Sequence, residues 1–268
     1  MDLLVTPPAE HLSLDAARLH EHPDGGRRFP DGEVYVRLPA LDEAVVVVHA
    51  GQPAPNEGLA YLYGTLAALC EREHTVRLAF SYTPYCRQDL AFEEGTLNYA
   101  RAMVRDLEDY VERTYAVDPH FAHREWVEGH AVERIRALPA IRDAVEMDEY
   151  TVVGPDLGAV ERFGLRGFRK ERHAGGVRLS GELDVDGENV LVFDDMIATG
   201  TTMVSARDRL VEQGAATVQA AAVHGVLAEG VERVRAAFDR LYLTNSIAER
   251  GGEVRVEPLI REAVGAEQ

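Results

Sequence analysis

The sequence predicts an α/β protein of two domains, each built on a mainly parallel sheet flanked by helices. The chain has 268 residues, which suits two domains of about 130 residues each better than one small core. Short apolar runs of strand length alternate with stretches of helical spacing. Acidic residues also follow several of these runs, at the carboxyl ends of strands where open parallel sheets bind their ligands.

The first half of the chain alternates strand and helix patterns. Pro30-Asp31-Gly32 predicts a turn that leads into a strand, because apolar and polar residues alternate behind it. The run Ala44 to Ala50 is apolar apart from His49, as expected of a strand buried on both faces. We expect strands at residues 34–38, 44–50, 76–82 and 115–117, and helical stretches within residues 14–19, 59–69 and 102–111.

An acidic, polar stretch between residues 140 and 150 predicts the domain boundary, which we place after residue 142. The expected domains are therefore residues 1–142 and 143–268. The second domain repeats the strand and helix rhythm of the first. We expect its strands at residues 151–154, 190–193, 218–223 and 241–243, with a helix from Met203.

The most informative stretch runs from Val190 to Thr202. Its apolar strand ends in Asp194 and Asp195, and the small, hydroxyl-rich segment 198–202 leads into a helix. Free N–H groups and hydroxyls at a helix N-terminus favour a phosphate. Two acids beside a buried strand are costly unless hydroxyl groups or a metal use them. The pattern suits a ribose 5-phosphate unit, and the alternative is a plain strand–helix junction with a threonine cap.

Composition excludes several classes of function. The chain carries 46 acidic residues against 28 Lys plus Arg, a formal net charge of -18, which repels nucleic acid and anionic membranes. It contains one lysine, Lys170. An acid-rich, lysine-poor chain is typical of a salt-adapted cytoplasm, so we expect higher stability in concentrated KCl. No apolar run approaches the length of a membrane span, so we expect a cytoplasmic protein. In that compartment we expect Cys70 and Cys86 to be reduced thiols.

The paired acids with their Thr-Gly-rich loop resemble the PRPP-binding signature of the phosphoribosyltransferase fold. That signature does not separate transferases from PRPP synthetases. The segment from Phe29 to Glu33 resembles the Phe-Pro-Asp-Gly-Glu segment of PRPP synthetases, which transferases lack. The resemblance implies two phosphoribosyltransferase-like domains. It also implies an adenine site built from Phe29, Asp31 and Glu33, often across a subunit boundary.

Three further segments match the same family. Arg87, Gln88 and Asp89 match its Tyr-x-Arg-Gln-Asp motif, which implies contacts to ATP and its phosphates. The histidine of Asp118-Pro-His120 matches a magnesium ligand, although Pro119 replaces Leu and a structural histidine is the alternative. Asp156, in Pro-Asp-Leu-Gly, matches a residue that binds a second metal or the ribose phosphate.

Lys170 and Arg172 lie in a charged loop that resembles the family's mobile catalytic Lys-x-Arg loop. A solvated loop is the alternative. The only lysine of an otherwise arginine-based chain argues for a specific role, because an ammonium is a compact, strongly hydrated point charge.

The resemblance implies a ribose-phosphate diphosphokinase that makes PRPP and AMP from ATP and ribose 5-phosphate, with Mg²⁺ and as a dimer or larger homo-oligomer. The alternatives are a phosphoribosyltransferase and a catalytically silent regulatory homologue. The loop departs from the family pattern at two positions, where Ala198 replaces Asp or Ser and Thr201 replaces Gly. Because threonine is β-branched, a left-handed backbone at Thr201 would be strained. The residues implied for ribose 5-phosphate are Asp194, Asp195, Thr199, Gly200, Thr201 and Thr202.

Overall fold

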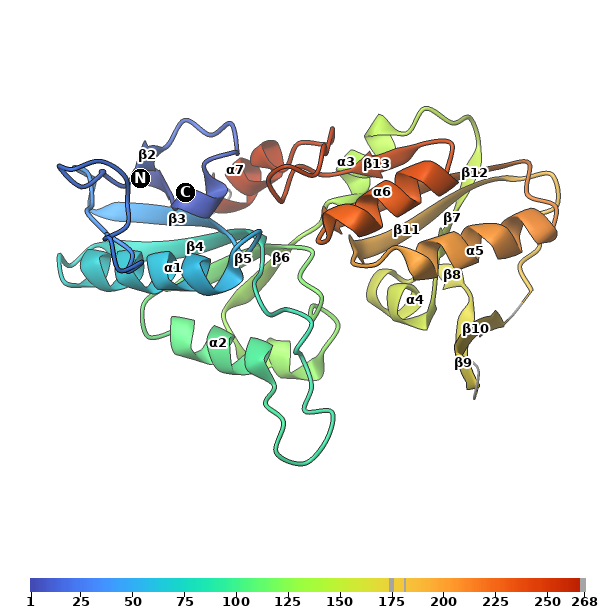
Figure 1. Cartoon of the computed structure of the whole chain (residues 1–268), viewed down its shortest axis with the longest axis horizontal. Helices are drawn as coiled ribbons and strands as arrows, with labels where there is room; N and C mark the ends of the chain where they lie inside the picture. The colour runs from blue at the N-terminus through green and yellow to red at the C-terminus, as the bar shows by residue number, and fades with distance from the viewer. Residues whose placement is uncertain (174–175, 181, 266–268) are drawn as a thin grey trace. The chain divides into compact units, whose positions relative to one another are not determined.

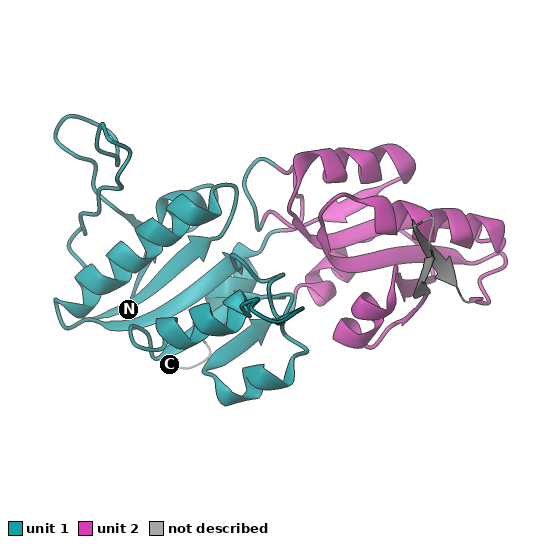
Figure 2. Ribbon diagram, turned by 60° about the horizontal axis from the view of Figure 1, so that its bottom comes forward, with its two compact units in different colours: residues 1–136, 246–249, 255–268 teal, residues 137–245, 250–254 magenta. Residues whose placement is uncertain are grey.

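The computed structural model describes residues 1–173, 176–180 and 182–265 (Figure 1). The chain divides into two compact units, drawn in teal and magenta in Figure 2. Unit 1 contains residues 1–136 and 246–249 with the C-terminal segment from Arg255. Unit 2 contains residues 137–245 and 250–254.

The division differs from the expected boundary in two respects. A boundary after residue 142 would cut α3 (Leu138–Ala144), which belongs to unit 2. The C-terminal helix α7 (Glu257–Gly265) belongs to unit 1, where Ile260 and Val264 are buried and the Ser13 N–H donates to Glu257 Oε1 at 2.8 Å. The return of the chain to the first unit depends on these distant contacts, so local sequence patterns could not predict it.

Unit 1 contains a six-stranded sheet in the order β2-β1-β3-β4-β5-β6, and every neighbouring pair is parallel. Its helices are α1, α2 and the C-terminal α7, with short 3₁₀ segments η1 (Pro7–Ala9) and η2 (Glu125–Gly129). The bounds are β1 Asp2–Val5, β2 Ala17–Arg18, β3 Ala44–Ala50, β4 Thr75–Tyr82, β5 Arg113–Val117, β6 Val132–Ile135, α1 Pro55–Cys70 and α2 Tyr99–Leu107.

Helix α1 and strand β3 confirm the sequence expectations. The residues Leu62, Leu66 and Leu69 recur at helical spacing, are fully buried and form one core cluster with the apolar strands. Strand β3 has the predicted bounds and lies between β1 and β4. Apart from His49 it is apolar, because a strand covered on both faces contacts other apolar groups on each side.

Two expectations for the N-terminal region are wrong. No helix forms within residues 14–19, where Ala17 and Arg18 instead make the short parallel strand β2, and the apolar Leu14 and Leu19 are simply buried. The turn at residues 29–33 is present, but the following strand is reduced to an isolated antiparallel bridge between Arg28 and Val34.

Unit 2 contains a five-stranded parallel sheet in the order β13-β12-β11-β7-β8, and an antiparallel hairpin of β9 and β10. With the two parallel sheets, this confirms the predicted fold class. The bounds are β7 Tyr150–Gly154, β8 Arg166–Gly167, β9 Arg169–His173, β10 Gly176–Ser180, β11 Asn189–Ile197, β12 Thr217–Gly225, β13 Leu241–Leu243, α4 Leu157–Phe163, α5 Thr201–Glu212 and α6 Ala228–Ala237.

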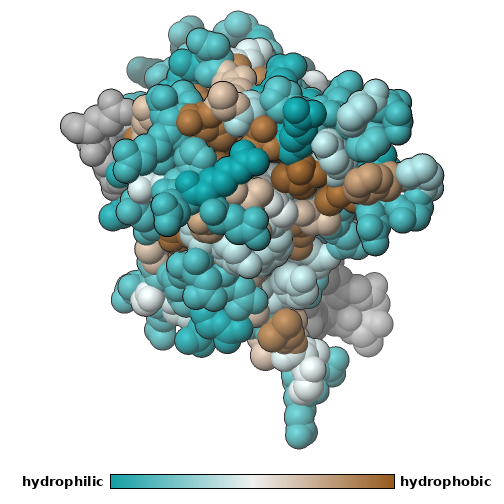
Figure 3. All heavy atoms as spheres, turned by 90° about the vertical axis from the view of Figure 1, so that its left-hand side faces the viewer, coloured by the Kyte–Doolittle hydropathy of each residue, from teal (hydrophilic) through white to brown (hydrophobic). Residues whose placement is uncertain are grey.

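The surface is largely hydrophilic on the face shown in Figure 3, with hydrophobic residues scattered over it. The most exposed large apolar side chains lie in the segment between β4 and α2, where Phe92 is 71% and Leu97 58% exposed. Within the described ranges, none of the helices has the length and apolar character that crossing a membrane requires.

Candidate active site

The two predicted acids lie at the carboxyl end of the central strand of unit 2. Strand β11 pairs with β7 on one side and β12 on the other, and its residues from Val190 to Phe193 are fully buried. The strand extends past the predicted end at residue 193 and includes Asp194 and Asp195. Both aspartates are buried, with 8% and 1% of their surface exposed.

Arg162 of α4 binds both acids. Its Nη2 atom lies 3.0 Å from Asp194 Oδ1 and 2.9 Å from Asp195 Oδ1. The Asp195 backbone N–H also donates to Asp194 Oδ1 at 2.9 Å. Burial raises the pKa of Asp194 well above its ordinary value, the charge of Asp195 raises it further, and the guanidinium of Arg162 opposes both effects.

The hydroxyl-rich loop ends in a left-handed residue that begins α5. Gly200 has φ 77° and is the N-cap residue, and α5 starts at Thr201. A Cβ at Gly200 would lie 2.7 Å from the backbone oxygen of Gly230, so glycine is required there for space as well as for conformation. Thr201 is therefore not strained by a left-handed backbone, because the left-handed residue of the loop is Gly200 and Thr201 is already helical.

Arg233 of α6 lies beside this loop. Its Nη1 donates to the backbone oxygen of Thr199, and lies 3.4 Å from Thr201 Oγ1. The Thr199 hydroxyl also donates a hydrogen bond to Thr201 Oγ1 at 3.4 Å. Sequence reasoning missed both Arg233 and Arg162. The available signal for Arg162 was its place on the helix that begins directly after the Pro-Asp-Leu-Gly motif.

Asp156 lies at the carboxyl end of β7, the neighbour of β11, and therefore at the same edge of the sheet as the twin acids. Its Oδ1 accepts a hydrogen bond from the Ala159 N–H at 3.1 Å and caps α4. The structure thus brings Asp156, Asp194, Asp195 and the 199–202 loop to one edge of one unit.

Lys170 and Arg172 lie on β9, where they pair with Leu179 and Val177 of β10 in an antiparallel hairpin. The sequence suggested a loop, and the backbone there is a strand. Their side chains lie outside the described part of the structure, so their predicted catalytic role stays a prediction.

In unit 1, the predicted adenine segment forms an exposed turn. The Phe29 N–H donates to the Glu33 oxygen at 2.8 Å, and the Glu33 N–H donates to Asp31 Oδ1 at 3.1 Å. The Phe29 ring makes edge-to-face contacts with His22 and Tyr35, with centroids 5.6 Å apart in both cases. The turn therefore presents an aromatic group and two carboxylates to solvent.

Asp89 is placed differently from Arg87 and Gln88. Arg87 is exposed, whereas Asp89 is 1% exposed and binds Arg124 with Nε 2.7 Å from Oδ2 and Nη2 3.4 Å from Oδ1. Its backbone oxygen accepts from the indole N–H of Trp126 at 3.3 Å. The Asp89 carboxylate is therefore buried against a protein partner, and its predicted contact with ATP stays a prediction.

His120 lies just after β5 in unit 1, while Asp156 belongs to unit 2. The Asp118 carboxylate of the same motif is buried and accepts a hydrogen bond from Arg134 Nε at 2.6 Å. Within the described residues, no group of three His, Cys, Asp or Glu side chains gathers as a metal site. Magnesium does not require one, because it commonly takes one or two carboxylates, water and substrate phosphates.

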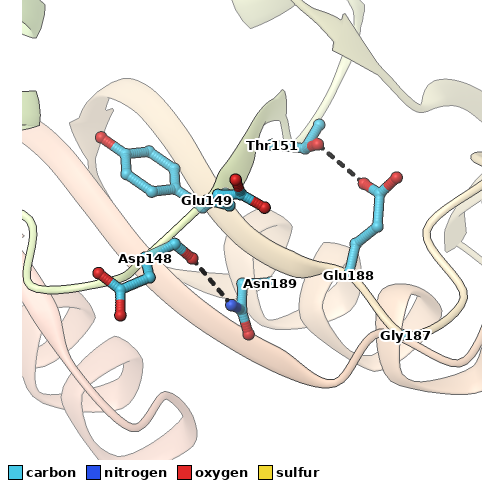
Figure 4. Close-up of a pocket in the computed structure, with 7 residues that line it drawn as sticks. Asp148, Glu149, Thr151, Gly187, Glu188 and Asn189 are labelled. Atoms are coloured by element: carbon cyan, nitrogen blue, oxygen red, sulfur yellow. Dashed lines mark hydrogen bonds between the residues drawn. The ribbon is translucent and has the colours of Figure 1, made fainter.

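A cavity lies at the opposite end of the unit 2 strands from Asp194 and Asp195, where β7 and β11 begin (Figure 4). This cavity of about 900 Å³ is lined by Asp148, Glu149 and Glu188 among others. Glu188 Oε2 accepts from the Thr151 hydroxyl at 2.8 Å, and the Asp148 oxygen accepts from Asn189 Nδ2 at 3.0 Å. Carboxylates repel phosphate, so this hollow does not compete with the 199–202 loop as an anion site.

A parallel sheet with paired acids at its carboxyl edge and a Thr-Gly loop opening a helix defines a phosphoribosyltransferase-type domain. Residues 132–250 match the family model described as "Phosphoribosyl transferase domain", and this range covers most of unit 2.

The chain belongs to the ribose-phosphate pyrophosphokinase family. It is 33% identical to the ribose-phosphate pyrophosphokinase of Methanopyrus kandleri over 96% of this chain and 93% of that protein. It is 34% identical to the enzyme of that name from Pyrococcus furiosus, over 87% of this chain and 89% of the other. The phosphoribosylpyrophosphate synthetase of Mycobacterium smegmatis shares the fold, with TM-score 0.73, 24% identity and coverage of 100% and 99%.

Proposed function

We propose that this protein is a ribose-phosphate diphosphokinase, which makes PRPP and AMP from ATP and ribose 5-phosphate by magnesium-assisted pyrophosphoryl transfer. One observation carries the proposal: in a chain of this family, two buried acids and a hydroxyl-rich loop meet at the carboxyl edge of one sheet. Family membership and fold alone do not define an activity, so the site is the stronger argument.

The sugar phosphate has a complementary partner for each of its ends. Asp194 and Asp195 accept hydrogen bonds from the ribose hydroxyls, because ionised carboxylates are acceptors only. The backbone N–H groups at the start of α5 and the hydroxyls of Thr199, Thr201 and Thr202 bind the 5-phosphate, which the helix dipole also attracts.

The reaction forms one bond and breaks one. The anomeric oxygen of ribose 5-phosphate bonds to the β-phosphorus of ATP, and the bond from that phosphorus to the oxygen bridging the α-phosphate breaks. AMP leaves with this oxygen, and the hydroxyl proton is released to solvent. Catalysis is chiefly positioning and charge neutralisation, for which Lys170 and Arg172 supply cations near the transferring group.

Magnesium, when bound, neutralises charge on the phosphates. The carboxylate oxygens of Asp156 suit Mg²⁺, because this hard cation prefers oxygen ligands. Asp156 also lies at the same edge of the sheet as Asp194 and Asp195. His120, in unit 1, stays a proposed magnesium ligand in its own right, although its nitrogen is a donor that Mg²⁺ favours less than oxygen.

The ATP side comprises Phe29, Asp31 and Glu33 with Arg87 and Gln88. We assign Asp89 a supporting part, because Arg124 already binds its carboxylate. The exposed aromatic turn suits a nucleotide site completed by a second copy of the chain, so a dimer or larger homo-oligomer is part of the proposal.

The test is to incubate the protein in concentrated KCl with ATP, Mg²⁺ and ribose 5-phosphate, and to measure AMP and PRPP. We expect both products in equal amounts, and AMP only when the sugar phosphate is present. A phosphoribosyltransferase would instead consume PRPP in the presence of a nucleobase, and a silent regulatory homologue would do neither. Either result would overturn the proposal.

A further inference from the structure

Arg162 is built into the sugar site although the predicted motifs do not include it. One atom, Nη2, contacts the Oδ1 atoms of both acids, at 3.0 and 2.9 Å. Only 8% of the arginine side chain is exposed, so the contact is shielded from bulk water. The contact to Asp194 is a charge-assisted hydrogen bond, which is strong and directional in such surroundings, whereas the contact to Asp195 is an ion pair.

The fold reserves space for this guanidinium. A Cβ placed on Gly158 would lie 2.9 Å from Arg162 Nη1 and 3.2 Å from Asp156 Oδ1. Glycine at this position therefore lets the arginine lie against the first turn of α4, whose start is set by the Asp156 cap. The guanidinium is held between the helix and the two carboxylates.

The contact of one guanidinium atom with two acids distinguishes this arrangement from an ordinary buried ion pair. One guanidinium faces two carboxylates, of which Asp194 is the more accessible, with 11% of its side chain exposed against 1% for Asp195. Two carboxylates this close repel each other strongly in a medium of low dielectric constant. The shared cation offsets that repulsion and keeps both groups turned toward one point.

We propose that Arg162 is a positioning residue of the sugar site, whose guanidinium holds Asp194 and Asp195 as a converging pair of hydrogen-bond acceptors for the ribose hydroxyls. The inference rests on the proposed function and adds a residue to it. Arg162 acts through the acids, while the 5-phosphate is bound independently by the loop at α5. Removing the guanidinium weakens binding of the sugar and leaves binding of phosphate alone unchanged.

The test compares Arg162→Gln and Arg162→Lys with the wild type by calorimetric titration of ribose 5-phosphate, inorganic phosphate and ATP, alongside steady-state KM and kcat. Arg162→Gln is expected to raise the dissociation constant and KM for ribose 5-phosphate at least tenfold, and those for phosphate and ATP by less than twofold. Arg162→Lys restores part of the loss, because an ammonium keeps the charge but not the fixed fork of donors.

Arg207→Gln is the matched control. Arg207 lies on α5 of the same unit, and its Nη1 donates to Asp208 Oδ1 at 3.1 Å at the surface. The substitution therefore removes the same charge without changing the contacts of Asp194 and Asp195. All its constants are expected to stay within twofold of wild type. An equal loss in Arg207→Gln would mean that net charge, rather than Arg162, controls binding.

A second pair of variants isolates the contact itself. In an Asp195→Asn background the repulsion between the acids is absent, so adding Arg162→Gln is expected to cost less than threefold in ribose 5-phosphate affinity. Gly158→Ala, which crowds the guanidinium without removing it, is expected to raise the same dissociation constant about threefold. This variant carries the test if Arg162→Gln does not fold.

Three outcomes would overturn the inference: unchanged sugar binding in Arg162→Gln, equal weakening of all three ligands, or full additivity with Asp195→Asn. If Arg162→Gln does not fold, sugar affinity in Gly158→Ala equal to wild type would overturn it. Failure of the wild type to bind ribose 5-phosphate would instead overturn the proposed function, so the two failures are distinguishable.

Discussion

Two buried aspartate sites, one in each unit, differ in how their charge is met. In unit 1, one guanidinium contacts both oxygens of the single acid Asp89, with Arg124 Nε at 2.7 Å and Nη2 at 3.4 Å. In unit 2, one guanidinium contacts one oxygen of each of two acids. One guanidinium therefore contacts a single acid in the first arrangement and two acids in the second.

This difference separates residues that share a motif-based prediction. Asp89 and Asp194 were both predicted to contact a substrate. Arg124 holds both carboxylate oxygens of Asp89 in the segment after β4, while Asp194 lies at the carboxyl end of β11, where we propose that the sugar binds.

The largest expected effect tests whether unit 2 performs the chemistry. Lys170→Ala is expected to lower kcat on the order of a thousandfold, the scale of a cation that neutralises transition-state charge. The measurement is AMP formation at saturating ATP and ribose 5-phosphate. A loss below tenfold would remove Lys170 from the catalytic group and weaken the assignment of chemistry to this unit.

The next effect tests the ligand-facing acid. Asp194→Asn is expected to lower kcat/KM for ribose 5-phosphate by about a hundredfold, or about 3 kcal/mol, because it replaces a charged acceptor by a neutral amide. Its KM for ATP is expected to stay within threefold. Steady-state kinetics with each substrate varied in turn provides the measurement.

Asp89→Asn is the matched variant in unit 1, and the comparison predicts the opposite pattern. We expect a loss of about 2 to 3 kcal/mol in the free energy of unfolding, because Arg124 loses its counter-charge, with kcat/KM for ribose 5-phosphate within threefold. Denaturant unfolding measures the first quantity. Similar kinetic losses in both variants would break the distinction between the two sites.

The smallest effect concerns a buried neutral group in unit 1. His49 is fully buried, its Nδ1 lies 2.8 Å from the Thr6 hydroxyl, and burial lowers its pKa from 6.5 to about 3. The unfolded chain binds a proton below about pH 6.5 and the folded chain does not, so stability falls as the pH drops through that range.

We therefore expect wild type to lose about 2 kcal/mol more unfolding free energy than His49→Gln between pH 7 and pH 5. Urea unfolding at the two pH values measures the difference. Equal losses in both proteins would show that the histidine takes up its proton without unfolding.

The sequence alone was enough for the fold class and for the local order of the proposed sugar site. Strand β3 was predicted with its observed bounds, because burial on both faces makes such a strand almost entirely apolar, here with His49 as the exception. The stretch from Asp194 to Thr202 was predicted as a unit because all its parts are contiguous. The helix expected within residues 14–19 was wrong, since Leu14 and Leu19 are buried by tertiary packing rather than along one helical face.

By itself, then, the sequence determined what local order can encode: the alternation of strands and helices, the acids at a strand end and the loop that opens α5. Only the tertiary structure decided which arginine meets which acid, that α7 returns to unit 1, and that Asp89 is buried against Arg124. The physical reason is that burial and ion pairing depend on contacts between residues far apart in the chain, which no local pattern records.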